Sequence, residues 1–278
     1  PYRGVGANYF DLFLRVLHGP TNTTSLVGLD RLAKAGIPFV RFGGPVSESD
    51  WRAYADRPGD YFACMDKVFR AAEKAGIGLI PSLFWSRNLP EFVGEPRDQW
   101  GNTASRTHEL MRRYVADFAA RYRDSPALWA WEFGNEPNLS VDLPNAKQFR
   151  PPGGTERDDL KSAHLVVMLS EFAKEVRRHD PHRAILSGNS HPRPCAWHNT
   201  REGSWAADSQ EQSREVLLRD NPAPLDTIGI HFYGDAPAQK AVAAWANDDA
   251  DYLRWARGLA REAGRPLFIG EFGLASKD

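Results

Sequence analysis

"LAKAGIPFV", residues 32–40, joins the end of an amphipathic segment to a short apolar run through one glycine. A glycine after helical periodicity, followed by β-branched or aromatic residues, is typical of a helix that ends and a strand that begins. Similar junctions recur as "AAEKAGIGLI" at 71–80 and "AREAGRPLF" at 260–268. This repetition predicts helices that alternate with strands, and therefore a parallel sheet.

The rest of the chain follows the same alternation. The predicted strands are 4–10, 38–44, 77–85, 127–136, 184–190, 226–233 and 266–273. The predicted helices lie near 24–35, 60–75, 106–123, 157–178, 209–219 and 249–263. Repeated βα units at this length favour an α/β fold of the (β/α)8 TIM-barrel type, as a single catalytic domain over 1–278.

Seven strands are predicted, and the residues after Glu271 are too few for an eighth strand and its helix. We therefore expect the eighth βα unit to be missing from the chain and the barrel to be incomplete at its C-terminus. A barrel without its last unit leaves two strand edges open, so a seven-stranded or open sheet is the alternative. The opening "PYRGVGANYF" has neither Met nor a signal peptide, which predicts that the natural N-terminus is also missing.

Composition excludes several classes of protein. The formal net charge is −1, from 35 basic and 36 acidic residues, so we expect neither a nucleic-acid partner nor a membrane surface. No apolar run approaches the ~20 residues that span a bilayer. Cys64 and Cys195 give no disulfide framework. We expect a monomer.

Polar and aromatic side chains gather where the predicted strands end, which is the active-site end of such barrels. They are Asn8, Arg41, Trp85, Asn135, Glu136, Asn189, His191, His231, Tyr233 and Glu271. The opposite strand ends carry mostly Pro, Gly and apolar residues. This asymmetry predicts an active site at the carboxyl ends of the strands.

Two carboxylates stand out within that group, Glu136 after the fourth strand and Glu271 after the seventh. The fourth and seventh strands face each other across a barrel mouth, so the two side chains can converge. Paired carboxylates on either side of a bond are the equipment of glycoside hydrolysis. We expect partial desolvation to raise the pKa of Glu136 toward the range of a general acid.

The neighbours have roles that suit this chemistry. We expect Arg41 to hold Glu271 ionised and Tyr233 to donate to the same carboxylate. Asn135 is a candidate for binding a sugar hydroxyl, and His231 for contacting the reacting ring or supporting the acid. Glu132 shares side-chain parity with Glu136 and is interpreted as a structural partner of Arg41.

Aromatic residues in the loops after strands three to five are candidates for stacking on sugar rings. They are Trp85, Trp100, Trp197 and Trp205. The segment "HPRPCAWH" places His191, Cys195 and His198 close in sequence, but the intervening prolines and the lack of a fourth ligand argue against a metal. His191 is interpreted as a sugar-contacting loop residue. We expect no metal and no cofactor.

The motifs "WEFGNEP" at 131–137 and "IGEFG" at 269–273 resemble the acid/base and nucleophile motifs of glycoside hydrolase family 5. That family belongs to the clan of retaining (β/α)8 glycosidases with catalytic Glu on strands four and seven. "VRFGG" around Arg41, "HFY" at 231–233 and "GVGANYF" at 4–10 fit the same pattern. The resemblance covers nearly the whole chain in order.

The resemblance implies a retaining double displacement on a carbohydrate, a β-linked glucan or mannan. Glu271 would attack the anomeric carbon, and Glu136 would first protonate the leaving oxygen and then activate water. Secretion or a periplasmic location follows from that function. Two departures stand against the family pattern. The end of strand three, "SLFWSRN", lacks the His of many members, and the eighth-strand Trp is absent.

Three alternatives stay open from the sequence. One is a sugar-binding barrel that has lost catalysis, and another is an exo-acting β-glycosidase on short oligosaccharides or glycoconjugates. A third is a metabolic barrel enzyme on a phosphorylated substrate, although no Gly-rich phosphate loop is present. The intact pair of Glu136 and Glu271 argues against a degenerate barrel.

Overall fold

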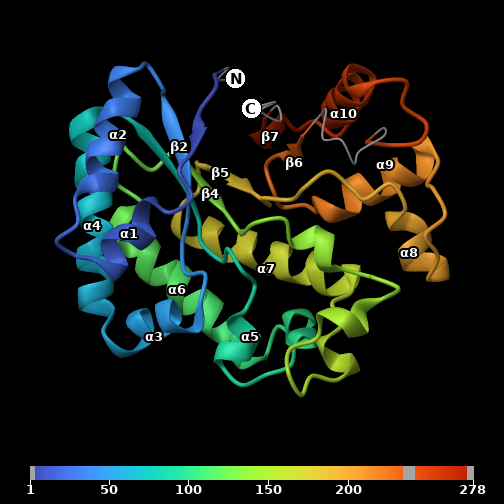
Figure 1. Ribbon diagram of the computed structural model, residues 1–278, viewed down its shortest axis with the longest axis horizontal. Helices are drawn as coiled ribbons and strands as arrows, with labels where there is room; N and C mark the ends of the chain where they lie inside the picture. Colours follow the sequence, from blue (N-terminus) through green and yellow to red (C-terminus); the bar gives the residue numbers. More distant parts are fainter. Residues whose placement is uncertain (1–3, 234–241, 274–278) are drawn as a thin grey trace, which may run out of the picture.

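The computed structural model describes residues 4–233 and 242–273, in which parallel strands alternate with helices (Figure 1). Each predicted strand contains an observed one. The strands are β1 (Ala7–Asn8), β2 (Phe39–Gly43), β3 (Gly78–Ser82), β4 (Ala130–Glu132), β5 (Ala184–Leu186), β6 (Ile228–Phe232) and β7 (Leu267–Phe272).

The helices include the predicted ones and several that the sequence analysis missed. They are α1 (Leu12–His18), α2 (Thr24–Lys34), α3 (Glu48–Asp56), α4 (Pro58–Ala75), α5 (Leu89–Phe92), α6 (Arg106–Tyr122), α7 (Ser162–His179), α8 (Ala196–Glu202), α9 (Gln210–Asp220) and α10 (Asp249–Glu262). The 3₁₀ turns are η1 (Arg97–Gly101), η2 (Pro137–Ser140), η3 (Ala146–Phe149) and η4 (Glu156–Asp158).

The missed helices α1, α3, α5 and α8 each lie between a strand and the next predicted helix. The predicted start of the helix at 157 is wrong. Residues 156–158 form η4, closed by a capping box between Thr155 and Asp158, so α7 begins only at Ser162.

The strands form two sheets in the described residues, one with the order β1-β2-β3-β4-β5 and one that pairs β6 with β7. Every observed pair is parallel, which confirms the α/β class with a parallel sheet. Arg41 pairs in register with Asn8 on one side and Ile80 on the other. The eight-stranded barrel stays a prediction.

The main core lies between the five-stranded sheet and helices α4, α6 and α7. Aromatic side chains fill it: Phe69 stacks on Tyr122 at 3.9 Å between ring centroids, and the hydroxyls of Tyr61 and Tyr114 lie 2.6 Å apart. Burying one such side chain contributes about 1.5–3 kcal/mol. These contacts hold the helices against the sheet and so fix the strand ends.

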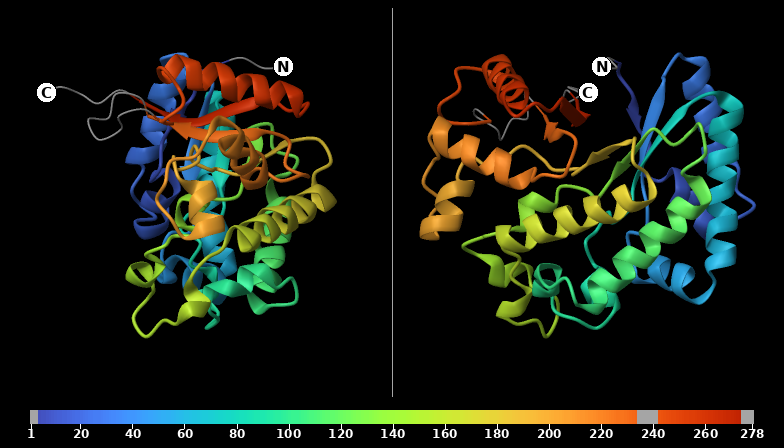
Figure 2. Two further views of the ribbon diagram at one scale, coloured as in Figure 1. Left: turned by 90° about the vertical axis from the view of Figure 1, so that its right-hand side faces the viewer. Right: turned by 180° about the vertical axis from the view of Figure 1, so that it is seen from behind.

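A second, smaller core packs α10 over β6 and β7 (Figures 1 and 2). Tyr252 of α10 stacks on Phe232 of β6, with 5.6 Å between the ring centroids. No helix within the described residues is both long and apolar enough to cross a membrane.

Candidate active site

Arg41 projects from the middle of β2 and is the centre of the site. The side chain is 1% exposed, and its Nε lies 2.6 Å from Oε1 of Glu132 while its Nη1 lies 2.7 Å from Oε1 of Glu271. Nη2 donates to Oδ1 of Asn135 at 3.0 Å. A buried cation needs such partners, since burying a charge without them costs several kcal/mol. Arg41 therefore ties β4 and β7 to β2.

Glu271, in β7, is held at both of its oxygens. Arg41 donates to Oε1, and the hydroxyl of Tyr233 donates to Oε2 at 2.6 Å. Burial and this bond to the carboxylate raise the pKa of Tyr233, so its hydroxyl stays protonated as a donor. Two fixed donors orient the carboxylate, as expected for a nucleophile that must meet one carbon atom.

Glu136 follows β4 in a left-handed backbone conformation, with φ of 48°. Such conformations are uncommon outside glycine and occur often at functional sites. The Glu136 amide donates to the carbonyl of Gly188 at 2.7 Å. A Cβ on Gly188, itself at φ of 72°, would collide with the carbonyl of Gly134, so only glycine fits there. The turn aims the Glu136 side chain toward β6 and β7.

One imidazole nitrogen faces both carboxylates. Nδ1 of His231 lies 3.2 Å from Oε1 of Glu136 and 3.4 Å from Oε1 of Glu271. Carboxylates only accept hydrogen bonds, so Nδ1 carries the proton. Gly270 leaves room for this ring, because a Cβ at that position would lie 2.8 Å from Nε2 of His231.

The bond from His231 is the largest influence on the Glu136 carboxyl, and it lowers the pKa of Glu136 against the opposing effect of burial. The expectation of a raised pKa is therefore wrong for the free protein. Desolvation at a strand end can be expected from the order of residues, whereas the imidazole N–H comes from β6, far along the chain.

The spacing of the two carboxylates bears on the chemistry. The facing oxygens of Glu136 and Glu271 lie within 4.8 Å of each other. Retaining glycosidases hold the carboxyl groups about 5–5.5 Å apart, whereas inverting enzymes leave about 6.5–9.5 Å for a water molecule. The observed spacing is typical of retention.

The same oxygens, with Nδ1 of His231, form the set in the described part of the chain that comes close enough to hold a metal ion. Arg41 and Tyr233 already donate to the two oxygens of Glu271. Because both oxygens of Glu271 already accept hydrogen bonds, the arrangement suits proton transfer and nucleophilic attack better than metal binding.

Most of the other predicted residues join this network. Trp85 lies under Arg41, with the guanidinium carbon 4.9 Å from the ring centroid, a cation–π geometry. Nδ1 of His191 lies 3.0 Å from the main-chain carbonyl of His231, and burial lowers the pKa of His191. His191 is buried and supports His231, so the structure gives it a place behind the site. The sugar contact proposed for it stays a prediction.

Three predicted aromatic residues lie elsewhere. Trp100 is fully buried and donates to the carbonyl of Arg87 at 3.2 Å, so it is not available as a candidate for stacking on a sugar ring. Trp197 donates to Glu215 of α9, and Trp205 is 54% exposed in the segment between α8 and α9. Neither Trp197 nor Trp205 has an observed contact with the two glutamates within the described residues.

The segment considered for a metal does not converge on one point. His191 bonds to β6, Cys195 contacts Asn199, and Nδ1 of His198 lies 2.8 Å from Asp208. Sequence reasoning missed a different residue, Arg87, which donates to the carbonyl of Asn135 at 2.7 Å. The signal that could have identified Arg87 is that a cationic side chain stands within the mostly apolar segment after β3.

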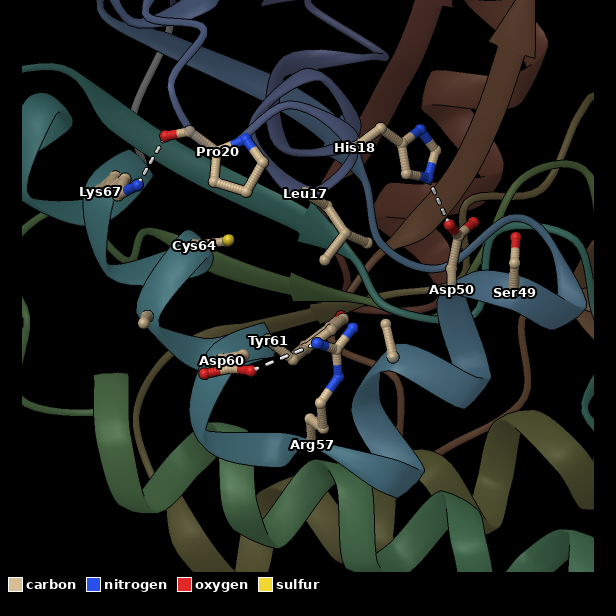
Figure 3. A pocket seen from close by; sticks show the side chains of 12 residues that line it. Leu17, His18, Pro20, Ser49, Asp50, Arg57, Asp60, Tyr61, Cys64 and Lys67 are labelled. Atoms are coloured by element: carbon tan, nitrogen blue, oxygen red, sulfur yellow. Dashed lines mark hydrogen bonds and ion pairs between the residues drawn. The ribbon is translucent and has the colours of Figure 1, made fainter.

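A cavity of about 350 Å³ lies away from the glutamates, between α1, α3 and α4 (Figure 3). Polar groups of its lining contact one another: His18 lies 2.6 Å from Asp50, and Arg57 lies 3.6 Å from Asp60. Lys67 donates to the carbonyl of Pro20 at 2.7 Å. Because these polar side chains of the cavity lining bind to one another or to the main chain, they give no indication of a ligand.

Comparisons with known proteins agree with this geometry. A family model described as Cellulase (glycosyl hydrolase family 5) matches residues 17–278. "Probable mannan endo-1,4-beta-mannosidase C" of Aspergillus terreus is 25% identical over 226 residues, which are 75% of this chain and 49% of that protein. "Mannan endo-1,4-beta-mannosidase F" of Aspergillus clavatus is 27% identical over 224 residues, 76% of this chain and 44% of that protein.

The chain thus spans about half the length of these curated relatives. Among solved structures, the endo-1,4-beta-mannanase from Rhizomucor miehei superposes with a TM-score of 0.68 at 15% identity. The match covers 100% of this chain and 79% of that chain, and at this identity it speaks for the fold alone.

Proposed function

The chain belongs to glycosyl hydrolase family 5, and from this premise we propose that it hydrolyses β-1,4-linked mannan with retention at the anomeric carbon. The membership confirms the resemblance of "WEFGNEP" and "IGEFG" to that family. The observation that carries the proposal is the convergence of Glu136 and Glu271 to within 4.8 Å beside Arg41 and His231. Mannan is favoured over glucan because the curated relatives named above are mannosidases.

We propose that both sheets belong to one barrel of the (β/α)8 type, in a single catalytic domain over 1–278, with seven of its strands in the described residues. Two hydrogen bonds between the sheets support this arrangement. Asn8 of β1 donates to the carbonyl of Gly270 in β7 at 3.1 Å. The amide of Asp226, just before β6, donates to the carbonyl of Ile185 in β5, also at 3.1 Å.

In the first step, Glu271 attacks the anomeric carbon and the glycosidic bond breaks as Glu136 gives its proton to the leaving oxygen. Arg41 and Tyr233 aim the Glu271 carboxylate. Glu136 must be protonated for this step although its pKa is lowered in the free protein. A bound sugar supplies the opposite influence, because it removes water from a side chain that is 28% exposed, and desolvation raises a carboxyl pKa.

In the second step, water attacks the anomeric carbon while Glu136 takes its proton, and the bond between that carbon and Glu271 breaks, which releases the sugar and restores the Glu271 carboxylate. In the glycosyl-enzyme, Glu271 is bound to the sugar as an ester and carries no negative charge. Its charge therefore no longer disfavours the ionised form of Glu136. Glu136 then accepts the proton as a base. His231, within reach of both glutamates, can donate to whichever of them carries the charge.

We further propose that the protein acts as a monomer outside the cytoplasm. The site described above draws its residues from one chain. A polymeric mannan must be cut before it can enter a cell, which supports a secreted or periplasmic enzyme.

Incubation with β-mannan, β-glucan and aryl β-mannobiosides tests the proposal. We expect mannan to be the preferred polymer. Glu271→Ala should abolish turnover, and azide should restore activated-substrate turnover with an α-glycosyl azide as product. Glu175→Ala is the control, since Glu175 is buried in α7 and pairs with Arg178 and His179, and it should keep activity.

Normal turnover by Glu271→Ala would refute the nucleophile assignment. Sugar binding without turnover by the unaltered protein would favour the alternative of a non-catalytic sugar-binding barrel.

A further inference from the structure

Arg87 is a partly buried cation in the turn after β3, and its backbone has φ of 55°, a left-handed conformation that residues with a side chain rarely adopt. The turn is held from two sides. The Arg87 amide donates to the carbonyl of Phe84 at 3.3 Å, and its own carbonyl accepts from Nε1 of Trp100 at 3.2 Å. Residues in such backbone conformations are concentrated at functional sites, so we expect the side chain of Arg87 to have a functional role.

The guanidinium reaches across to the loop after β4. Nη1 donates to the carbonyl of Asn135 at 2.7 Å, and Nη2 donates to Oγ of Ser140 at 3.0 Å. No carboxylate of the described residues lies within ion-pair distance of Arg87. One face of the side chain lines a cavity of about 370 Å³ with Leu139 and Ser140.

These contacts bracket Glu136. The peptide group between Asn135 and Glu136 is fixed at both polar atoms, since its carbonyl accepts from Arg87 and its N–H donates to Gly188 at 2.7 Å. On the far side, Ser140 ends η2, which begins directly after Glu136. The orientation of that peptide plane decides the direction in which the Glu136 side chain leaves the backbone.

We propose that Arg87 is the positioning residue of the acid/base carboxylate: it clamps the Asn135–Glu136 peptide and so holds the Glu136 side chain in line with the leaving oxygen. The inference rests on the proposed function. Arg87 does not touch the reacting atoms, and it acts through Glu136.

The charge of Arg87 adds an electrostatic effect to the clamp. Burial lowers the pKa of Arg87 to about 10, which leaves the guanidinium charged at neutral pH. The titratable groups that face Glu136 come from every neighbouring strand end: Arg87 after β3, His191 after β5, His231 and Tyr233 at β6, and Glu271 in β7. A cation near Glu136 favours its ionised form, so removing Arg87 should raise the pKa of Glu136.

The test compares two substrates that differ only in the leaving group, 2,4-dinitrophenyl and phenyl β-mannobioside. The first leaves without protonation, whereas the second needs a general acid. For Arg87→Met we expect kcat/KM on the phenyl substrate to fall about 100-fold, the lower range for loss of general acid catalysis. On the dinitrophenyl substrate it should fall less than about 5-fold.

Two measurements separate positioning from a general loss of structure. The basic limb of the kcat/KM profile should move to higher pH in Arg87→Met, because a raised pKa keeps Glu136 protonated longer. Arg87→Lys keeps the positive charge and one hydrogen-bond donor. Its kcat/KM profile should therefore keep the basic limb of the wild type, and its kcat/KM on the phenyl substrate should recover at least about a tenth of what Arg87→Met loses.

Arg183→Met is the control, because Arg183 also donates to main-chain carbonyls, those of Leu128, Arg123 and Ser125, at the opposite end of β4, although it pairs in addition with Asp180 at 2.9 Å. It should lower the melting temperature and leave the ratio of the two substrates unchanged. An equal fall on both substrates in Arg87→Met, or an unmoved pH limb in that variant, would overturn the inference. Wild-type protein that turns over neither substrate would instead overturn the proposed function.

Discussion

Replacing Arg41 should cost more stability than any other single change at the site. Arg41→Met removes a side chain that is 1% exposed and leaves Glu132, which is fully buried, and Glu271 without their cation. Removing one partner of a buried ion pair costs about 3–5 kcal/mol, because the remaining charge keeps its desolvation penalty. That is a large part of a total stability that is about 5–15 kcal/mol for a typical domain.

Urea unfolding followed by tryptophan fluorescence measures the loss. Arg41→Met should lower the free energy of unfolding by about 3–5 kcal/mol. The double variant Arg41→Met with Glu132→Leu no longer contains the unpaired, buried carboxylate of Glu132. It should therefore recover about half of the lost free energy of unfolding. Arg41→Met and the double variant should both be inactive, because in both of them Oε1 of Glu271 lacks the hydrogen bond from Arg41.

The exposed pair of Arg52 and Glu48 provides the control. Both side chains are 63% exposed, so Arg52→Met should cost less than about 0.5 kcal/mol. The reasoning fails if Arg41→Met costs no more than Arg52→Met, or if Glu132→Leu destabilises the Arg41→Met protein further.

Three other changes have distinct expected results. Tyr233→Phe removes one donor to Glu271 and should lower kcat about 10-fold or more at unchanged melting temperature, measured on β-mannan. Asp66→Asn should cost about 1 kcal/mol at pH 7, because the hydrogen bond from Arg121 lowers the pKa of Asp66 in the folded protein. That stabilisation is present above the ordinary value of 3.8 and is lost as the pH falls through the lowered pKa, so urea curves of Asp66→Asn and wild type should converge in acid. Gly188→Ala should lower the melting temperature and the rate together, since the new Cβ collides with a main-chain carbonyl after β4; an unaltered melting temperature would contradict that steric reading.

The sequence was a good guide where a local pattern carries the information. Each strand is a short apolar run bounded by glycine, proline or polar residues, so the strands could be placed from residue order alone. Glu136 and Glu271 were found because each interrupts such a run at its end. Helix α3 also had a local signal that the analysis passed over, the capping box between Ser47 and Asp50.

Features that depend on distant partners could not be predicted in the same way. The hydrogen bond that lowers the pKa of Glu136 most comes from His231, which is 95 residues away in the chain. Arg87 acts on a main-chain carbonyl, which every residue has, so no side-chain motif identifies its target. Trp100 looks like an exposed loop aromatic until the fold packs it against His108 and Phe133.

The bond between Arg41 and Glu271 joins residues that are 230 positions apart, near opposite ends of the chain. Arg41, Glu132 and Glu136 come from the five-stranded sheet and the turn after β4, whereas Glu271 comes from β7 of the other sheet. The two glutamates therefore face each other only when the sheets are docked. Recovery of activity during refolding would report that docking rather than the formation of either core.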